Sequence, residues 1–266
     1  MYVCNKKYSM QKKDFGLNRL IEIMDELRVK CPWDKKQTLQ TLRYLTIEEV
    51  YELSDAILKE DMSEIKNELG DLLLHIVFYS KIASEKNKFD IEDVISTICE
   101  KLIYRHPHIY KNTKVNDEVD VKLNWEKLKM KSGKKSVLEG VPKSLPSLVK
   151  AYRIQEKVKG IGFKWENKDQ SWKKVIEEFE ELKRELVNGE KDKIEEEFGD
   201  LLFSLVNYAQ FININPEDAL EKTNIKFIER YKLMENLLKQ KNIDILDLDI
   251  VQMEKYWGKA KDELRS

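Results

Sequence analysis

The chain contains one sequence pattern twice. Residues 48–79 read EEVYELSDAILKEDMSEIKNELGDLLLHIVFY, and residues 177–208 read EEFEELKRELVNGEKDKIEEEFGDLLFSLVNY. The two segments align without a gap, and 12 of their 32 positions are identical. Repetition of a segment of this length is typical of a duplicated structural unit. Any fold for this chain must therefore accommodate two similar units.

The junction between the two copies is predicted where helix-breaking residues gather. Gly133, Gly140 and Pro142 lie between the repeated segments, and such residues favour turns and loops. We therefore expect an N-terminal unit over residues 1–135 and a C-terminal unit over residues 136–266.

Both units are predicted to be helical. Apolar residues recur at spacings of three and four, which is the period of an amphipathic helix. The segments with this period are 17–29, 39–59, 64–86, 91–105, 147–159, 171–188, 192–212 and 217–240. Only in residues 243–250 do apolar and polar residues partly alternate, so this segment is expected to be a loop or a short strand. The 9 glycines and 5 prolines are too few for a turn-rich all-β fold, so we expect an all-α protein with two tandem helical bundles.

Four residues suit the predicted helix ends. Thr38, Asp90 and Asn215 each precede a helical segment and can accept hydrogen bonds from its first free N–H groups. Gly189 follows the segment that ends at residue 188 and can adopt the left-handed conformation that often terminates a helix.

Composition disfavours several classes of protein. The 48 Lys and Arg residues balance 49 Asp and Glu residues, so no basic excess favours nucleic acid as a partner. Three cysteines without a Cys-x-x-Cys spacing disfavour a disulfide framework and a zinc finger. The longest apolar stretch, around residues 72–79, is far shorter than the roughly 20 residues that cross a bilayer. We therefore expect a cytoplasmic protein that binds neither membranes nor nucleic acid.

Acidic residues occupy apolar helix faces in both copies. On a helical wheel at about 100° per residue, Glu49 falls within an apolar arc and Glu52 lies on its rim. Glu68 and Asp71 border the apolar stripe of the next helix. The equivalent residues of the second copy are Glu178, Glu181, Glu197 and Asp200.

These eight carboxylates favour a bound cation in each copy. A solvated helix face explains most acidic residues of the chain, such as Glu180 and Glu195, but it fits poorly for carboxylates beside buried apolar residues. Desolvating an uncompensated carboxylate costs several kcal/mol, and four that converge between two helices also repel one another. All-oxygen ligation suits Mg²⁺ or Mn²⁺ rather than Zn²⁺. We therefore predict that the eight residues are metal ligands, four in each copy.

A di-iron bundle is the nearest alternative metal protein. Such bundles use Glu-x-x-His pairs, whereas none of His75, His106 and His108 stands three residues after one of these glutamates. His75 follows Asp71 by four residues but is replaced by Ser204 in the second copy. Packing is therefore the simpler role for His75.

Basic and aromatic residues recur in the same order after each acidic block. Lys226 and Arg230 are one helical turn apart, as are Trp257 and Lys261 if their segment is helical. The corresponding residues of the first copy are Lys101, Arg105, Trp125 and Lys129. Each pair alone is more simply a solvated face or packing, but recurrence of the whole set favours a phosphate-bearing substrate, because Lys and Arg neutralise phosphate oxygens and Trp stacks on a base.

The doubled pattern resembles the MazG family of nucleoside triphosphate pyrophosphohydrolases. The motifs that carry this resemblance are EExxE at 48–52 and 177–181, ExxD at 68–71 and 197–200, CPWD at 31–34 and GFKW at 162–165. The resemblance implies an all-α fold, Mg²⁺-dependent cleavage of nucleoside triphosphates to nucleoside monophosphate and pyrophosphate, and clearance of non-standard or surplus nucleotides. It also implies a homodimer whose helices complete the bundles.

The resemblance also implies roles for individual residues. It implies that the eight clustered acids named above are the metal ligands. The catalytic residues it implies are Glu178, Glu181, Lys129, Lys226 and Arg230. The substrate-binding residues it implies are Glu177, Lys193, Lys226, Arg230, Trp257 and Lys261. The C-terminal unit is expected to carry most of the turnover, and the first copy has Glu64 in place of Lys193, which would weaken phosphate binding there.

A protein without enzymatic activity is the competing interpretation. The duplicated bundle would then be a helical scaffold for docking other proteins, and it would fold without any cation.

The chain has no glycine-rich phosphate loop and no Gly-x-Ser-x-Gly motif, so it gives no support to P-loop or serine-nucleophile chemistry.

Overall fold

The computed structural model describes residues 16–265, apart from residues 112, 116, 118, 119, 122, 123, 126, 127 and 129–134. This described part consists of helices and loops, without a β-strand, which confirms the all-α prediction. Residues 243–250 form a loop around the short 3-10 helix η3 (Ile245–Asp247). None of the described helices is long and apolar enough to cross a bilayer.

The chain divides into two compact units, which we call unit 1 (Met1–Lys114) and unit 2 (Val115–Ser266). The boundary predicted from the sequence, between residues 135 and 136, is C-terminal to this division. Residues 129–134 beside that boundary lie outside the described part of the chain, so the predicted boundary stays a prediction.

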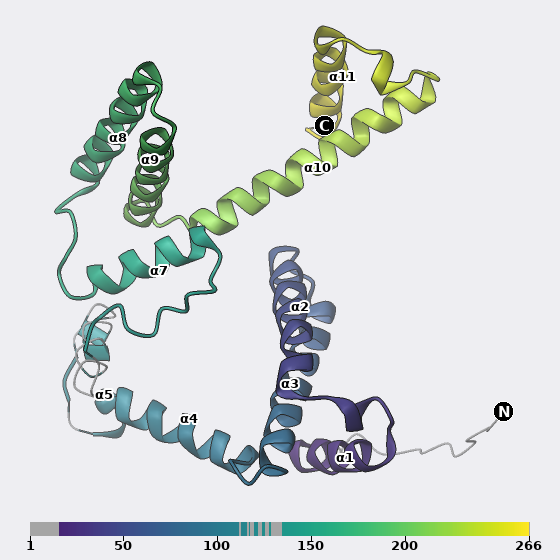
Figure 1. The fold of residues 1–266 in the computed structure, drawn as a ribbon, viewed down its shortest axis with the longest axis vertical. Coiled ribbons are helices and arrows are strands. Elements are labelled where there is room, and N and C mark those ends of the chain that lie inside the picture. The colour runs from purple at the N-terminus through teal and green to yellow at the C-terminus, as the bar shows by residue number, and fades with distance from the viewer. Residues whose placement is uncertain are drawn as a thin grey trace. The chain divides into compact units, whose positions relative to one another are not determined.

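Unit 1 is built around a helical hairpin. Its elements are α1 (Leu17–Lys30), η2 (Asp34–Lys36), α2 (Leu39–Leu58), α3 (Met62–Ser84), α4 (Ile91–Arg105) and α5 (Pro107–Tyr110) (Figure 1). Helices α2 and α3 pack against each other, and α1 packs against α3. Their core contains Met24, Leu42, Val77, Phe78 and Ile82, each at most 2% exposed. The hairpin therefore has its apolar core near the N-terminal end of α2.

Unit 2 contains two helical hairpins. Its described elements are α7 (Ser147–Lys159), α8 (Lys168–Asn188), α9 (Lys191–Phe211), α10 (Pro216–Gln240), η3 and α11 (Ile250–Glu263) (Figure 1). Helices α8 and α9 form one hairpin, with α7 packed against α9. Helices α10 and α11 form the other around Met234, Leu238 and Ala260. The α8–α9 hairpin is the structural equivalent of α2–α3 in unit 1.

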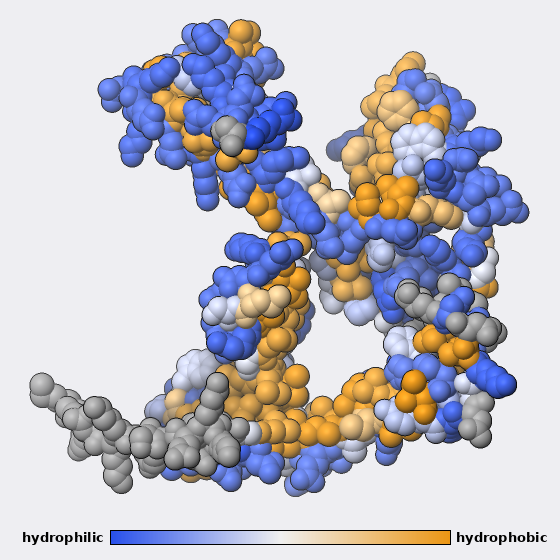
Figure 2. Space-filling view, turned by 180° about the vertical axis from the view of Figure 1, so that it is seen from behind, coloured by the Kyte–Doolittle hydropathy of each residue, from blue (hydrophilic) through white to orange (hydrophobic). Residues whose placement is uncertain are grey.

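Both equivalent hairpins leave apolar side chains on the surface, and Figure 2 shows such exposed apolar residues in several parts of the molecule. On α2 and α3 they include Val50, Leu69, Leu73 and Ile76. On α8 and α9 they include Ile176, Phe179, Phe198 and Leu202. An uncovered apolar face of this kind is typical of a surface that another protein covers.

The predicted helix ends are confirmed. Thr38 accepts a hydrogen bond from the backbone N–H of Thr41 in a capping box, and Asp90 caps α4 in the same way. Asn215 accepts from the N–H of Glu217 at the start of α10. Gly189 ends α8 with a φ of 75°, a left-handed conformation in which a Cβ atom would be strained.

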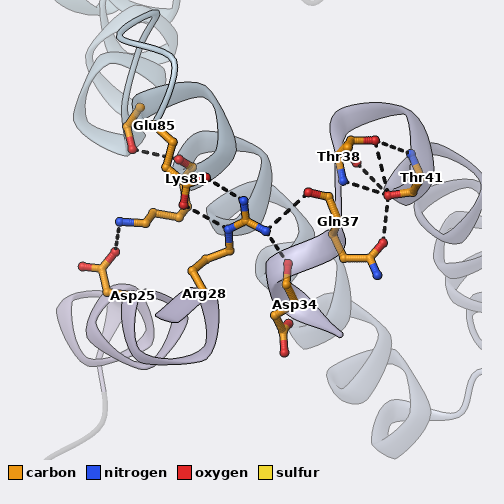
Figure 3. A network of polar contacts seen from close by, with 9 residues as sticks. Asp25, Arg28, Asp34, Gln37, Thr38, Thr41, Lys81 and Glu85 are labelled. Carbon is orange, nitrogen blue, oxygen red and sulfur yellow. Dashed lines mark hydrogen bonds and ion pairs between the residues drawn. The ribbon is translucent and has the colours of Figure 1, made fainter. Parts of the chain in front are cut away.

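One guanidinium group connects three segments of unit 1 (Figure 3). Arg28 at the end of α1 donates to the Glu85 carboxylate at the end of α3, at 2.6 and 3.0 Å. It also donates to the backbone carbonyl oxygens of Asp34 and Gln37, the latter at 3.3 Å. These contacts hold the loop with the CPWD motif against α1 and α3, directly before α2 begins.

Candidate metal and nucleotide site

Three of the predicted acids converge in each unit. Glu49 of α2 lies beside Glu68 and Asp71 of α3, and one carboxylate oxygen of each lies within 4.8 Å of the others. The equivalent cluster in unit 2 meets the same distance limit. Its members are Glu178 of α8 with Glu197 and Asp200 of α9. The hairpin geometry explains this convergence, because residues three apart on α3 and α9 share the face that contacts the preceding helix.

The clusters are electrostatically unfavourable without a counter-ion. Burial, followed by the charges of Asp71, Glu52 and Glu68, raises the pKa of Glu49. Burial and the charge of Glu52 likewise raise the pKa of Glu68. In unit 2, burial and the charges of Glu181 and its neighbours raise the pKa of Glu197. In each case the environment disfavours the charged form of the carboxylate.

Two buried carboxylate oxygens reinforce this conclusion. Oε2 of Glu68 and Oε2 of Glu197 are buried and have no hydrogen-bond partner within the described part of the chain. Such oxygens normally have a donor or a cation beside them. The two clusters present only oxygen atoms, which are the ligands of hard divalent cations. Both clusters are therefore compatible with a divalent metal ion.

The remaining predicted ligand of each unit lies beside its cluster rather than within it. Glu52 is exposed on α2, and Glu181 is half-buried on α8, where it pairs with Arg184 at 3.0 Å. Both are close enough to raise the pKa of a clustered carboxyl group, Glu52 that of Glu49 and Glu181 that of Glu197. Ligation by Glu52 and Glu181 stays a prediction.

A cation that no sequence motif predicted lies beside the second cluster. Lys174 of α8 places its Nζ 2.8 Å from Glu178 and 2.6 Å from Glu177. The two carboxylates raise the pKa of Lys174, so its ammonium group stays charged. Its position one helical turn before Glu178 was the available signal, because residues four apart meet on a helix. Unit 1 has Leu45 at the equivalent position and lacks this charge.

A cavity of about 510 Å³ opens beside the acidic cluster of unit 2. Helix α7 contributes Gln155 to its lining, and the GFKW loop contributes Phe163 and Trp165. Glu178 and Asp200 form part of the wall, so the cavity is continuous with the acidic cluster. Its volume falls in the range typical of small-molecule sites.

Unit 1 keeps the acids but changes the other residues that line this cavity. On α8 and α9, Lys174, Ser204 and Asn207 line the cavity, and Ser171 donates a hydrogen bond to Asn207. Their equivalents on α2 and α3 are Leu45, His75, Phe78 and Leu42. Leu42 and Phe78 belong to the apolar core of unit 1, at 0% and 2% exposed. Apolar core therefore occupies positions in unit 1 that are polar in unit 2.

The predicted nucleotide-binding residues of α10 and α11 form a separate group. The ring of Trp257 lies 4.9 Å from that of Phe227, and the Arg230 guanidinium lies 5.9 Å from the Trp257 ring centre. Lys226 is exposed on α10, and Lys261 is half-buried on α11. None of these residues lines the cavity beside the acidic cluster.

The other predicted substrate residues lie on the surface or outside the described chain. Glu177 is exposed and pairs with Lys174 at 2.6 Å, while Lys193 pairs with Glu190 at 3.0 Å in the first turn of α9. In unit 1, Lys101 is exposed and Arg105 is half-buried on α4. Lys129 lies outside the described residues. The roles implied for these residues stay predictions.

Sequence comparison identifies the family. The MazG nucleotide pyrophosphohydrolase domain matches residues 37–110 and 167–234, and these two spans contain both carboxylate clusters. The chain belongs to the MazG family. The two matches to one MazG domain also agree with the duplication seen in the sequence, although the second span ends before α11 and Trp257.

Two relatives named as nucleoside triphosphate pyrophosphohydrolases match almost the entire chain. The nucleoside triphosphate pyrophosphohydrolase of Escherichia coli strain K12 is 37% identical over 254 residues, which cover 92% of this chain and 97% of that protein. The nucleoside triphosphate pyrophosphohydrolase/pyrophosphatase MazG of Thermotoga maritima is 41% identical over 259 residues, with coverage of 95% and 98%. A crystal structure of a mazG-related protein from Thermotoga maritima matches 43% of this chain and 99% of its own, at 28% identity and a TM-score of 0.39.

Proposed function

We propose that the protein is a Mg²⁺-dependent nucleoside triphosphate pyrophosphohydrolase, with Mn²⁺ as an alternative ion. Its reaction adds water across the bond between the α and β phosphates and releases a nucleoside monophosphate and pyrophosphate. The observation that carries the proposal is a cluster of three carboxylates, two of which, Glu178 and Asp200, line a cavity that is also lined by Lys174 and aromatic rings. Membership in the MazG family and the names of its relatives support this reaction.

In the proposed mechanism, unit 2 provides the main catalytic residues. Glu178, Glu197 and Asp200 would hold the cation, with Glu181 beside them. A divalent cation bound there would supply positive charge to phosphate oxygens and acidify a water molecule. The chain contributes further positive charge through Lys174, which lines the cavity, and this charge offsets the negative charge that develops on the phosphates.

We assign the group on α10 and α11 to the nucleotide as well. Lys226 and Arg230 would contact phosphate oxygens, while Trp257 and Lys261 would pack against the nucleoside. Since none of these residues lines the cavity of unit 2, the proposal requires that dimerisation or substrate binding bring them to it. In the cell, the reaction would clear non-standard or surplus nucleotides.

A homodimer accounts for the apolar surface of the two hairpins. Phe179, Phe198 and Leu202 remain about half exposed on α8 and α9, and burying large apolar side chains is the main driving force for obligate association. A second copy of the chain would cover these residues and complete the helical bundle. The scaffold alternative also explains an exposed apolar face, but it does not explain the buried carboxylates.

Product analysis with the full-length protein tests the activity. Incubation with each nucleoside triphosphate and Mg²⁺ should release pyrophosphate and nucleoside monophosphate. Orthophosphate as the sole phosphate product would contradict cleavage between the α and β phosphates. A protein without activity, whose melting temperature does not respond to Mg²⁺, would support the scaffold instead.

The variant Glu178→Gln should lower pyrophosphate release by at least about a hundredfold, because the cluster loses a charged ligand. Glu180→Gln, which replaces an exposed acid paired with Lys183 on the same helix, serves as the matched control and should retain activity. Glu49→Gln should reduce release much less than Glu178→Gln. Equal losses in the Glu49 and Glu178 variants would refute the assignment of turnover to unit 2.

A further inference from the structure

We propose that the cavity of unit 2 receives the nucleobase, and that the side-chain oxygen of Gln155 accepts a hydrogen bond from an N–H group of that base. This inference rests on the proposed function, because it specifies which part of the nucleotide enters the cavity. It makes Gln155 a specificity-determining residue.

Gln155 is a buried polar residue with one unused hydrogen-bonding atom. Its side chain lines the cavity from α7, and the residue is only 3% exposed. Nε2 donates to the backbone carbonyl of Phe203 on α9 at 2.7 Å. Oε1 is buried and has no hydrogen-bond partner in the described part of the chain. A buried amide oxygen without a partner destabilises the folded state, and a ligand that donates to it would remove this cost.

The chemistry of the cavity excludes the phosphates as the group that contacts Gln155. The side-chain oxygen of Gln155 can only accept a hydrogen bond. Phosphate oxygens at neutral pH are mostly ionised and also accept, so a hydrogen bond between the two groups lacks a donor. The N–H groups of a nucleotide belong to its base. Aromatic rings of Phe163 and Trp165 also line the cavity, and base stacking on such rings is favourable. The charged side chain of Lys174 lies where the phosphates would approach the acidic cluster.

Asn207 offers the complementary group. Its Oδ1 accepts a hydrogen bond from the hydroxyl of Ser171 at 3.0 Å. Its Nδ2 makes no hydrogen bond to another residue in the described part of the chain, so it can donate to a ligand in the cavity that Asn207 lines. An acceptor from Gln155 and a donor from Asn207 together match the edge of a base, where an N–H group neighbours a carbonyl oxygen or ring nitrogen.

Comparison with unit 1 distinguishes residues that serve base binding from residues that serve cation binding. Unit 1 retains its three clustered acids, whereas the position of Asn207 is occupied by the buried Phe78 and that of Ser171 by the buried Leu42. If the polar residues of unit 2 served only the acidic cluster, the same cluster in unit 1 would need them too. Their replacement by core residues indicates a role in contacts with a larger ligand.

A structural role is the alternative for Gln155, since its amide joins α7 to α9. Gln210 makes the reciprocal connection, because its Nε2 donates to the backbone carbonyl of Tyr152 on α7 at 3.0 Å. Gln210 is also buried, at 8% exposed, but it does not line the cavity. Gln210→Met is therefore a matched control that removes the same kind of helix–helix hydrogen bond.

The test compares substrates with and without a base. Gln155→Met and Gln210→Met are prepared in the full chain, and kcat/KM for pyrophosphate release is measured with ATP, GTP, CTP, UTP and ribose 5-triphosphate. For Gln155→Met we expect kcat/KM to fall about tenfold or more for at least one nucleoside triphosphate, with ribose 5-triphosphate unaffected. Gln210→Met should change all five substrates by one common factor.

Several outcomes would overturn the inference. One is a common factor for all five substrates with Gln155→Met, which would indicate a structural role or a contact with the ribose. Another is an unchanged kcat/KM for every nucleoside triphosphate. If Gln155→Met does not fold, Asn207→Ala takes its place and should also lower kcat/KM for a nucleoside triphosphate but not for ribose 5-triphosphate.

A binding measurement keeps this inference distinct from the proposed function. Calorimetry compares nucleoside monophosphates with ribose 5-phosphate for the wild-type protein and for Gln155→Met. If no triphosphate yields pyrophosphate but the base-dependent part of binding is lost in Gln155→Met, the proposed function fails and the base site stands. If pyrophosphate is released and Gln155→Met retains the full base-dependent part of binding, the function stands and the base site is refuted.

Discussion

A single basic side chain distinguishes the electrostatics of the two acidic clusters. Lys174 lies 2.8 Å from Glu178, whereas unit 1 has Leu45 at that position. A fixed ammonium group repels a divalent cation and attracts phosphate. Unit 2 is therefore better suited to bind an anionic substrate, while the cluster of unit 1 has no lysine at this position to repel a cation.

The variant Lys174→Leu, which copies unit 1, tests this contrast. We expect KM for nucleoside triphosphates to rise about tenfold or more, because a charge-assisted contact to phosphate is lost. The Mg²⁺ concentration for half-maximal thermal stabilisation should fall, since the repelling charge is gone. Lys183→Leu, which removes a lysine paired with exposed Glu180, is the control and should change neither quantity. An unchanged KM for Lys174→Leu would contradict a phosphate contact.

The raised pKa values of the clusters predict how pH affects stability. The pKa of Glu49, Glu68 and Glu197 lies above the ordinary value of 4.5 in the folded protein. The folded chain then binds protons more tightly than the unfolded chain, so this contribution stabilises the protein as pH falls through the raised values and is lost as pH rises. Mg²⁺ competes with these protons for the same oxygens.

We therefore expect Mg²⁺ to raise the melting temperature more at about pH 8 than at about pH 5.5. The comparison uses matched samples with Mg²⁺ or with a chelator, so that pH effects from other residues cancel. Equal increases at both pH values would contradict competition between protons and Mg²⁺ for these carboxylates.

At the scale of secondary structure, helix positions were predictable and the cavity was not. The apolar period of α7 predicted residues 147–159, which are the observed bounds. Thr38 and Asp90 marked helix starts because capping is a local interaction. Gln155 gave no comparable signal, since its importance depends on Phe203, 48 residues away, and on the space beside both. Such tertiary contacts leave no period in the sequence.

The Arg28 network provides an element-scale prediction. The guanidinium of Arg28 lowers the pKa of Glu85, so the pair stabilises unit 1 at pH values above the ordinary pKa of 4.5 and loses this effect as pH falls through the lowered value. The Arg28 side chain is only 10% exposed and that of Glu85 is 36% exposed. After allowance for solvent screening, we expect Glu85→Gln to destabilise the protein by about 1 kcal/mol at neutral pH.

Thermal melts across the acidic range measure this effect. Glu85→Gln should lower the melting temperature by a few degrees at neutral pH, and the difference from wild type should shrink as pH falls below the pKa of Glu85. Glu26→Gln breaks an exposed pair with Lys30 within α1 and should have little effect. A difference for Glu85→Gln that persists unchanged at acid pH would show that the ion pair is not its cause.

At the scale of the whole molecule, the proposed homodimer can be tested through the exposed face of the α8–α9 hairpin. Phe198 is 53% exposed there, and Phe198→Asp would place a charge in any interface that covers it. We expect light scattering to show a monomer and pyrophosphate release to fall. Leu246→Asp changes a residue of η3 that is 87% exposed and should leave the dimer intact. A wild-type protein that is monomeric in solution would refute the dimer.

The replacement of Ser171 and Asn207 by Leu42 and Phe78 in unit 1 has an evolutionary consequence. Because both copies are encoded in one gene, every molecule carries one hairpin with polar residues at these positions and one with buried apolar residues there. Substitutions in the apolar copy can then change folding without altering the polar residues of the other. We expect that, in libraries randomised at Leu42 and Phe78, core packing alone decides which substitutions are tolerated.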